Sequence, residues 1–184
     1  MRIIAGSLKG RKIQGPADDR VRPTSDMVKE ALFSMVTHHV DLGVVVDLFT
    51  GTGNVGLEAL SRGAEKVYFC DASRDSIALT RENIRHCGVT EGVVVLNSDW
   101  RRSLERISEK ADLIFLDPPY KAGLLEDCIS EIDALDLLNA DGIIVAEHDN
   151  DTVLPESIGG LLQLKTRRYG KKYLTVFAYP EEEE

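Results

Sequence analysis

The stretch from Val44 to Gly63, VVVDLFTGTGNVGLEALSRG, constrains the fold of this chain more than any other. It begins with a short apolar run rich in β-branched residues, which has the length and composition of a buried parallel strand. Three glycines follow at the spacing Gly51-x-Gly53-x-x-Gly56, and good helix formers lead from them to Gly63. A strand, a tight glycine turn and a helix in this order predict a site where a ligand lies close to the backbone, at the positive end of the helix dipole.

The acid directly ahead of these glycines indicates which ligand the loop takes. The glycine spacing is also that of dinucleotide-binding folds, but Asp47 ends the strand, where it meets whatever lies over the loop. A carboxylate repels a pyrophosphate and attracts the ammonium of an amino-acid-like ligand. S-adenosylmethionine has such an ammonium and no phosphate. We therefore predict S-adenosylmethionine as the cofactor, and the motif Asp117-Pro118-Pro119-Tyr120 supports this choice.

The rest of the chain alternates strands and helices, as expected of an α/β fold with a parallel sheet. We expect further strands at residues 66–71, 93–96, 111–116 and 143–146, the last of them after a turn at Asp141-Gly142. We expect helices at 25–38, 57–62 and 76–86, and one helix or a broken pair at 124–138. Two strands at 161–165 and 173–178, with no helix between them, predict an antiparallel hairpin. The result is a Rossmann-like class I methyltransferase fold, with a mostly parallel seven-stranded sheet and an antiparallel C-terminal hairpin. We divide the chain into a basic N-terminal extension with a helix, residues 1–40, and a methyltransferase domain, residues 41–184.

Polar residues that follow the second and third strands extend the predicted cofactor site. Asp71 lies twenty positions after Gly51, the distance at which a carboxylate meets the ribose hydroxyls of an adenosine, with helix capping as the alternative. Asp99 is placed to reach the adenine amino group, and Trp100 either shields that pocket or belongs to the core. The predicted cofactor contacts are Asp47, Thr50, Gly51, Gly53, Asn54, Asp71, Ala72, Asp99 and Trp100.

The motif Asp117-Pro118-Pro119-Tyr120 follows the predicted strand 111–116 directly and indicates the reaction. The exocyclic amine of a nucleobase is a weak nucleophile, because its lone pair is delocalised into the ring. The Asp117 carboxylate and the Pro118 carbonyl can each accept one N–H of such an amine, since successive prolines hold a rigid extended turn. The Tyr120 ring offers a face on which an extruded base stacks. We therefore predict that Asp117, Pro118, Pro119 and Tyr120 are the catalytic residues.

Composition and cysteine count exclude several other classes of protein. The 184 residues contain no apolar run near the ~20 residues that span a membrane, and the N-terminus has no signal-peptide core. The three widely spaced cysteines suggest neither a disulfide framework nor a metal site. We expect a cytoplasmic protein that does not associate with membranes and binds no metal.

Basic residues are concentrated in two segments, although the net charge of the chain is −9. Residues 1–29 contain seven basic residues against three acidic ones, and residues 165–172 contain five basic residues and no acidic one. Such runs are either solvated surface or contacts to nucleic-acid phosphates. The tail Glu181–Glu184 contributes four of the negative charges.

These motifs together resemble those of the RsmD-type 16S ribosomal RNA guanine-N2 methyltransferases, over nearly the whole chain. The matching segments are MRIIAG at 1–6 with KGR at 9–11, RPT at 22–24, EALF at 30–33, DLFTGTG at 47–53, GLEALSRGA at 56–64, FLDPPY at 115–120 and EH at 147–148. The N-terminal segments are the discriminating ones, because many methyltransferases share the glycine loop and the DPPY motif. Two positions depart from the family, which usually has alanine in place of Thr50 and a basic residue in place of Met27.

The resemblance implies a substrate as well as a reaction. It implies transfer of one methyl group to the N2 amine of a specific guanine in 16S rRNA, within the small ribosomal subunit or its assembly intermediate, where ribosomal proteins are further partners. We expect a monomeric enzyme whose basic residues contact the RNA. The predicted RNA-binding residues are Arg2, Lys9, Arg11, Lys12, Arg22 and Lys171.

Three alternatives fit the sequence less well. A DNA adenine-N6 methyltransferase shares DPPY and the glycine loop, but it needs more sequence for target recognition than residues 1–40 provide. A nicotinamide-dependent Rossmann oxidoreductase needs a substrate domain and paired acid/base residues that the chain lacks. A non-catalytic RNA-binding module would have no reason to keep an intact DPPY motif.

Overall fold

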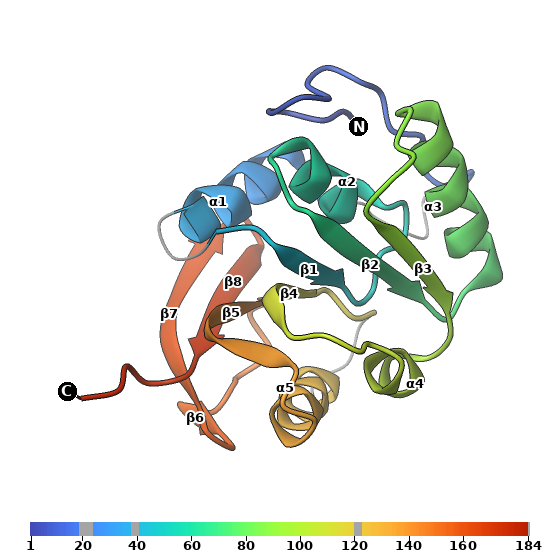
Figure 1. Cartoon of the computed structure of the whole chain (residues 1–184). Coiled ribbons are helices and arrows are strands. Elements are labelled where there is room, and N and C mark those ends of the chain that lie inside the picture. Colours follow the sequence, from blue (N-terminus) through green and yellow to red (C-terminus); the bar gives the residue numbers. More distant parts are fainter. Residues whose placement is uncertain (19–23, 38–40, 120–122, 184) are drawn as a thin grey trace.

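The computed structural model describes residues 1–18, 24–37, 41–119 and 123–183. An eight-stranded sheet forms its centre, with the strand order β3-β2-β1-β4-β5-β8-β7-β6 (Figure 1). The strands are β1 Val44–Asp47, β2 Lys66–Asp71, β3 Val93–Asn97, β4 Ala111–Leu116, β5 Leu138–His148, β6 Ser157–Ile158, β7 Leu161–Tyr169 and β8 Lys172–Ala178. The helices are α1 Asp26–Thr37, α2 Asn54–Ser61, α3 Arg74–His86, α4 Trp100–Glu105 and α5 Leu124–Ala134.

The direction of the strands agrees with the expected mixed sheet. Strands β1 to β5 are parallel to one another. Strand β8 pairs antiparallel with β5, and β7 and β6 continue the sheet in antiparallel pairs. The mostly parallel sheet with an antiparallel C-terminal hairpin is therefore confirmed. The predicted number of seven strands is wrong by one, because Ser157 and Ile158 pair with β7 as a strand too short to show a periodic pattern in the sequence.

Two other elements differ from the expected ones. Asp141 and Gly142, expected to turn, lie inside β5. Ala111 pairs with Leu138 and Leu113 with Ile143, so residues 139–142 form a bulge. The preceding helix α5 accordingly ends at Ala134 and not near residue 138. The short helix α4 was not expected from the sequence.

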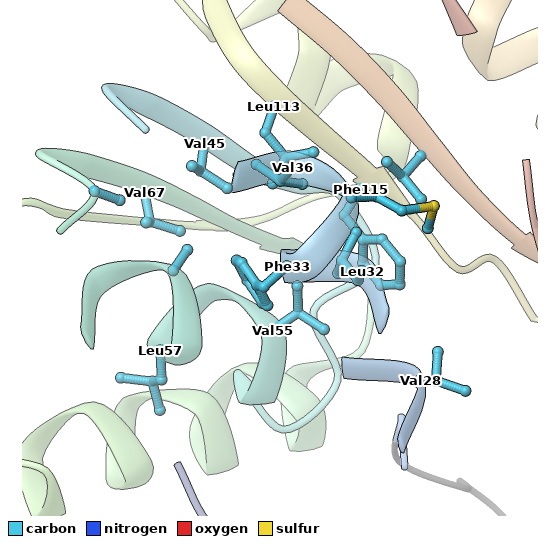
Figure 2. Packing of buried hydrophobic residues seen from close by; sticks show 14 of the residues in the cluster. Val28, Leu32, Phe33, Val36, Val45, Val55, Leu57, Val67, Leu113 and Phe115 are labelled. Carbon is cyan, nitrogen blue, oxygen red and sulfur yellow. The ribbon is translucent and has the colours of Figure 1, made fainter. Parts of the chain in front are cut away.

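Helices cover both faces of the sheet (Figure 1). Helices α1, α2 and α3 pack on one face together with Ile3 and Ile13 of the N-terminal segment, and α4 and α5 pack on the other. Figure 2 shows the first layer, in which Phe33 of α1 gathers with Val45 of β1 and Val55 of α2. We call these the α1 face and the α5 face. Alternate residues of each strand enter them: Val45 belongs to the α1 face and Val46 to the α5 face.

A buried ion pair ties the N-terminal segment to α1 and α2. Lys29 and Glu58 are fully buried, with 3.0 Å between Nζ and Oε2. Lys29 also donates to the Arg2 carbonyl at 2.7 Å, and Glu58 accepts from the amides of Ile4 and Ala5 at 2.9 and 3.1 Å. The first residues of the chain are thus held against α2 by charge-assisted hydrogen bonds as well as by apolar packing.

Among the described residues, no helix is long and apolar enough to cross a bilayer. All three cysteines are described, and each is buried and free of disulfide bonds.

Candidate active site

The five parallel strands end at one edge of the sheet, which we call the carboxyl edge. It is formed by the ends of β3, β2, β1, β4 and β5, in that spatial order. Acidic residues lie at the ends of four neighbouring strands: Asp71 ends β2, Asp47 ends β1, Asp117 follows β4 and Glu147 lies near the end of β5. Ligand sites of open parallel sheets form at this edge.

The loop between β1 and α2 is held by hydrogen bonds to the neighbouring strand β2 and to α3. Thr50 N–H donates to the Cys70 carbonyl at 2.8 Å, and the Thr80 hydroxyl donates to the Gly51 carbonyl at 2.9 Å. Gly51 and Gly53 adopt φ of 58° and 84°, a left-handed conformation that favours glycine. A Cβ at Gly51 would meet nothing within 4 Å, so the backbone is open there to a ligand.

Asp47 is buried beneath this loop. Its Oδ2 accepts from the Thr50 hydroxyl at 2.7 Å and from Gly56 N–H at 3.1 Å, inside the first turn of α2. Burial raises the pKa of Asp47 to about 7; these two hydrogen bonds oppose the rise, and the charges of Asp71 and Asp117 add to it. Thr50, where the family usually has alanine, therefore holds the carboxylate that we predicted to attract the cofactor. A cationic ligand over the loop would favour its ionised form.

Asp71 closes the other side of the loop. Its Oδ2 accepts from Gly51 N–H at 3.0 Å and its Oδ1 from Ser73 N–H at 2.9 Å. The cap of α3 is Ser73, whose hydroxyl accepts from Ser76 N–H, so Asp71 is not needed as a helix cap. Each carboxylate oxygen has a further lone pair for a ribose hydroxyl. Ala72 is exposed beside it.

Asp99 and Trp100 lie at the start of α4, beyond the end of β3. Asp99 caps this helix by accepting from Arg102 N–H at 3.0 Å, a role that was not expected from the sequence. Trp100 is partly buried against the α5-face core, and the Arg101 guanidinium lies 4.5 Å from the centroid of its ring. Both residues are at the predicted edge, and contact with a cofactor stays a prediction.

The predicted catalytic motif follows β4 at the centre of the carboxyl edge. Asp117 is half-buried, and burial raises its pKa to about 6 while the positive charge of Lys172 lowers it. Pro118 is half-buried and Pro119 exposed. Tyr120 lies outside the described residues.

One acidic residue at this edge was not among the predicted site residues. Glu147 is 5% exposed and lies on β5, next to the strand that leads into Asp117. In the sequence it stands in the EH segment at 147–148, one of the segments that carry the resemblance, and at the end of a buried strand, a position that it shares with Asp47 and Asp71. Burial and the charge of Asp117 raise the pKa of Glu147, whereas Lys172 and the Thr24 hydroxyl lower it.

Strand register places three acids on the same side of the sheet. Asp47 pairs with Phe115, and Phe115 with Val145; the two apolar residues belong to the α1-face core. Asp117 and Glu147 lie two residues beyond Phe115 and Val145, so the alternation of side chains directs all three carboxylates to the α1 face. The carboxyl edge is therefore strongly negative, as the binding of a cationic ligand requires.

The predicted RNA-binding residues lie in two regions. Arg2 and Lys12 are exposed and form an antiparallel β-bridge with each other, and the Arg2 carbonyl also accepts from Lys29. Lys171 is exposed in the β7–β8 turn. Because Tyr173 pairs with His148, that turn lies at the carboxyl edge.

The other three predicted RNA-binding residues are not placed at the carboxyl edge by the structure. Lys9 is exposed in a loop whose residues Ser7 and Leu8 bond to the C-terminal end of α2, away from the carboxyl edge. Arg11 donates to the Cys87 carbonyl at the end of α3. Arg22 lies outside the described residues.

The described part of the chain contains no cluster of three or more metal-ligating side chains. The carboxyl edge thus combines an open glycine loop with the carboxylates of Asp47 and Asp71 and a half-buried acceptor at Asp117. Such an arrangement can hold a cationic nucleoside next to a nucleophile that donates hydrogen bonds.

Known proteins resemble this chain over most of its length. Residues 1–178 match the family described as conserved hypothetical protein 95. The chain is 38% identical to the putative rRNA methyltransferase YlbH of Bacillus subtilis over 180 residues, 96% of this chain and 98% of that protein. It is 31% identical to the ribosomal RNA small subunit methyltransferase D of Escherichia coli K12 over 157 residues, 84% and 78% of the two chains.

Solved structures share the fold. The putative methyltransferase yhhF from Escherichia coli matches with a TM-score of 0.84 and 26% identity, over 96% of each chain. A putative methylase from Haemophilus influenzae matches with a TM-score of 0.80 and 29% identity, over 98% of this chain and 99% of that one. The expected class I methyltransferase fold is therefore confirmed.

Proposed function

The chain belongs to the RsmD family, whose model is described as conserved hypothetical protein 95, and from this membership we propose that it methylates the N2 amine of a guanine in 16S rRNA. Curated relatives are named as small-subunit ribosomal RNA methyltransferases. We further propose S-adenosylmethionine as the donor and the small ribosomal subunit, or its assembly intermediate, as the substrate.

The position of Asp117 is the observation on which the proposed chemistry depends. It follows β4 at the carboxyl edge, half-buried, with a pKa near 6, so the carboxylate is mostly ionised at neutral pH. An ionised carboxylate accepts one N–H of the base amine, and the Pro118 carbonyl accepts the other. These two acceptors draw the nitrogen toward tetrahedral geometry and stabilise the positive charge that develops on it during attack.

The glycine loop fits the proposed cofactor. Bound S-adenosylmethionine supplies a methyl group already activated by a sulfonium. Asp47 attracts the ammonium of the ligand, Asp71 accepts from its ribose hydroxyls, and Gly51 leaves room for close approach. The chain then needs only to orient amine and donor and to exclude water, which is the part of catalysis that positioning provides.

The basic surfaces fit an RNA substrate. We propose that residues 1–40 contact rRNA through Arg2 and Lys12, and that Lys171 contacts it from the hairpin turn at the carboxyl edge. These exposed cations neutralise phosphates, whereas the negative edge between them accepts only the extruded base and the cationic donor.

Transfer of a labelled methyl group tests this proposal. Small subunits that lack the modification are incubated with the protein and tritiated S-adenosylmethionine, and incorporation into rRNA is counted. We expect Asp117→Asn to lower the rate at least a hundredfold with little change in cofactor affinity by calorimetry, because the amide is a weaker acceptor without charge. The matched control is Asp141→Asn, an exposed residue near the opposite end of β5. Equal rates for both variants would refute the role of Asp117.

A further inference from the structure

One carboxylate oxygen of Glu147 is buried and has no partner within residues 1–18, 24–37, 41–119 and 123–183. The residue is 5% exposed, and its Oε2 makes no hydrogen bond to any described residue. Its Oε1 lies 3.7 Å from Lys172 Nζ, which is too long for a hydrogen bond but close enough for electrostatic attraction. A buried acceptor without a donor is costly, and more so when it is charged. This cost is explained if a ligand supplies the missing donor.

The position of Glu147 identifies that ligand as the base. The register that pairs Leu116 with Ala146 continues to place Asp117 beside Glu147 at the ends of neighbouring strands. The alternation within β5 directs Glu147 to the α1 face, and Asp117, just beyond the end of β4, is near enough for its charge to act on Glu147. A base whose amine donates to Asp117 therefore presents its adjoining ring atoms to Glu147.

Guanine and adenine differ at that adjoining position. Next to its N2 amine guanine has N1–H, a donor, whereas N1 of adenine, next to the N6 amine, is an acceptor. An ionised carboxylate accepts from N1–H and repels the N1 lone pair of an adenine-like edge. Two neighbouring carboxylates thus match the two neighbouring donors of guanine.

We propose that Glu147 is the residue that selects guanine, with its Oε2 accepting the N1–H of the base whose N2 amine donates to Asp117. This inference rests on the proposed function and adds the basis of its specificity. Lys172, on β8, lies 3.7 Å from Oε1 and favours the ionised carboxylate against burial and the charge of Asp117, which raise its pKa, and it leaves Oε2 to a ligand. The Thr24 hydroxyl, which precedes α1, acts in the same direction, so the N-terminal extension contributes to the pocket.

A substrate analogue separates this role from a structural one. Small subunits are reconstituted with either guanine or 2-aminopurine at the mapped target; 2-aminopurine keeps the N2 amine but has an acceptor at N1. We expect the unaltered enzyme to methylate guanine at least tenfold faster than 2-aminopurine by kcat/KM. In Glu147→Gln the amide can donate to N1 as well as accept from it, so we expect the preference to fall to within about threefold.

Two comparisons isolate the N1 contact. 2-Aminopurine also lacks O6, but that loss affects both enzymes equally, so the change in preference between them reports N1 alone. The control variant is Glu109→Gln, whose glutamate pairs with Lys66 near the opposite edge of the sheet. It should keep the full preference. Normal cofactor affinity in Glu147→Gln would show that the fold and the cofactor loop are intact.

The possible results separate the role of Glu147 from the reaction itself. An unaltered enzyme that methylates 2-aminopurine as fast as guanine would overturn the proposal, and so would an undiminished preference in Glu147→Gln. If Glu147→Gln does not fold, Glu147→Ala replaces it in the same comparison and should likewise lose most of the preference for guanine, because the carboxylate that repels the N1 lone pair is absent. Absence of transfer to the N2 amine of guanine would instead refute the proposed function on which the inference rests, a different outcome from transfer without selectivity.

Discussion

Replacing Lys29 by methionine tests how the N-terminal segment is held. The Lys29 ammonium is fully buried and contacts Glu58 Oε2 at 3.0 Å, the Arg2 carbonyl at 2.7 Å and Asn54 Oδ1 at 2.8 Å. Burial lowers the pKa of Lys29, and the hydrogen bond and charge of Glu58 oppose this. Methionine fills a similar volume but leaves the Glu58 carboxylate without its main counter-charge.

The size of the effect follows from what remains around Glu58. Breaking a buried ion pair by removing one partner costs about 3–5 kcal/mol. Glu58 keeps Arg62 Nε at 2.9 Å and the amides of Ile4 and Ala5, so we expect the lower end of this range, about 3 kcal/mol. For a chain of this length that corresponds to a fall in Tm of roughly 6–12 °C.

Urea unfolding and thermal melts measure the change. Lys29→Met with Glu58→Gln removes both charges and should recover part of the loss, because no charge is then left buried alone. The control is Lys66→Met, which removes a half-exposed ion pair of 2.8 Å and should shift Tm far less. A Lys29→Met variant as stable as the Lys66→Met variant would refute this reasoning.

Three further predictions concern the cofactor, the RNA and pH. Asp71→Ala should weaken S-adenosylmethionine binding about tenfold by calorimetry without altering particle binding, since a bidentate acceptor is lost; unchanged affinity would remove Asp71 from the site. The double variant Lys12→Glu with Lys171→Glu should bind small subunits more weakly, and its binding constant should depend less steeply on salt concentration. The control Lys110→Glu, at the amino end of β4, should change neither. A salt dependence of the double variant as steep as that of the parent would contradict phosphate contacts. Burial raises the pKa of Asp47 to about 7, so the folded state binds its proton more tightly and stability is lost as the pH rises from about 4 to 7. Asp47→Asn should remove that loss, so its free energy of unfolding in urea at pH 8 should exceed that of the parent by at most about 4 kcal/mol. If the free energy of unfolding changed with pH in the same way in both proteins, Asp47 would not titrate as described.

Much of the fold can be read from the sequence because its strands are strongly apolar. Strands β2 and β4 have the predicted bounds, since four consecutive apolar residues are buried in each, at 67–70 and at 113–116. The sequence does not predict helix α4, because its six residues include two arginines and a glutamate, and only Trp100 and Leu104 give it an apolar side. The bulge in β5 was read as a turn, because Asp141-Gly142 has local turn chemistry that the pairing with β4 overrides.

The candidate site likewise contains residues that the sequence indicates and residues that only the structure reveals. Asp47 and Asp117 belong to motifs that the chemistry of the ligand requires, so spacing alone indicates them. Glu147 belongs only to the short EH segment, which assigns it no role. The proposed role depends on burial, on strand register and on an oxygen that has no partner among the described residues, and only the structure provides these observations. The hydrogen bond from Thr50 to Asp47 is likewise a property of the folded loop.

Identification of the methylated nucleoside tests the central claim most directly. Small-subunit rRNA from particles incubated with the protein and S-adenosylmethionine is digested to nucleosides and analysed by mass spectrometry against standards. We expect N2-methylguanosine at one position, formed by the unaltered enzyme and lost with Asp117→Asn. Methyl groups on adenine N6, or none on rRNA at all, would contradict the proposed reaction.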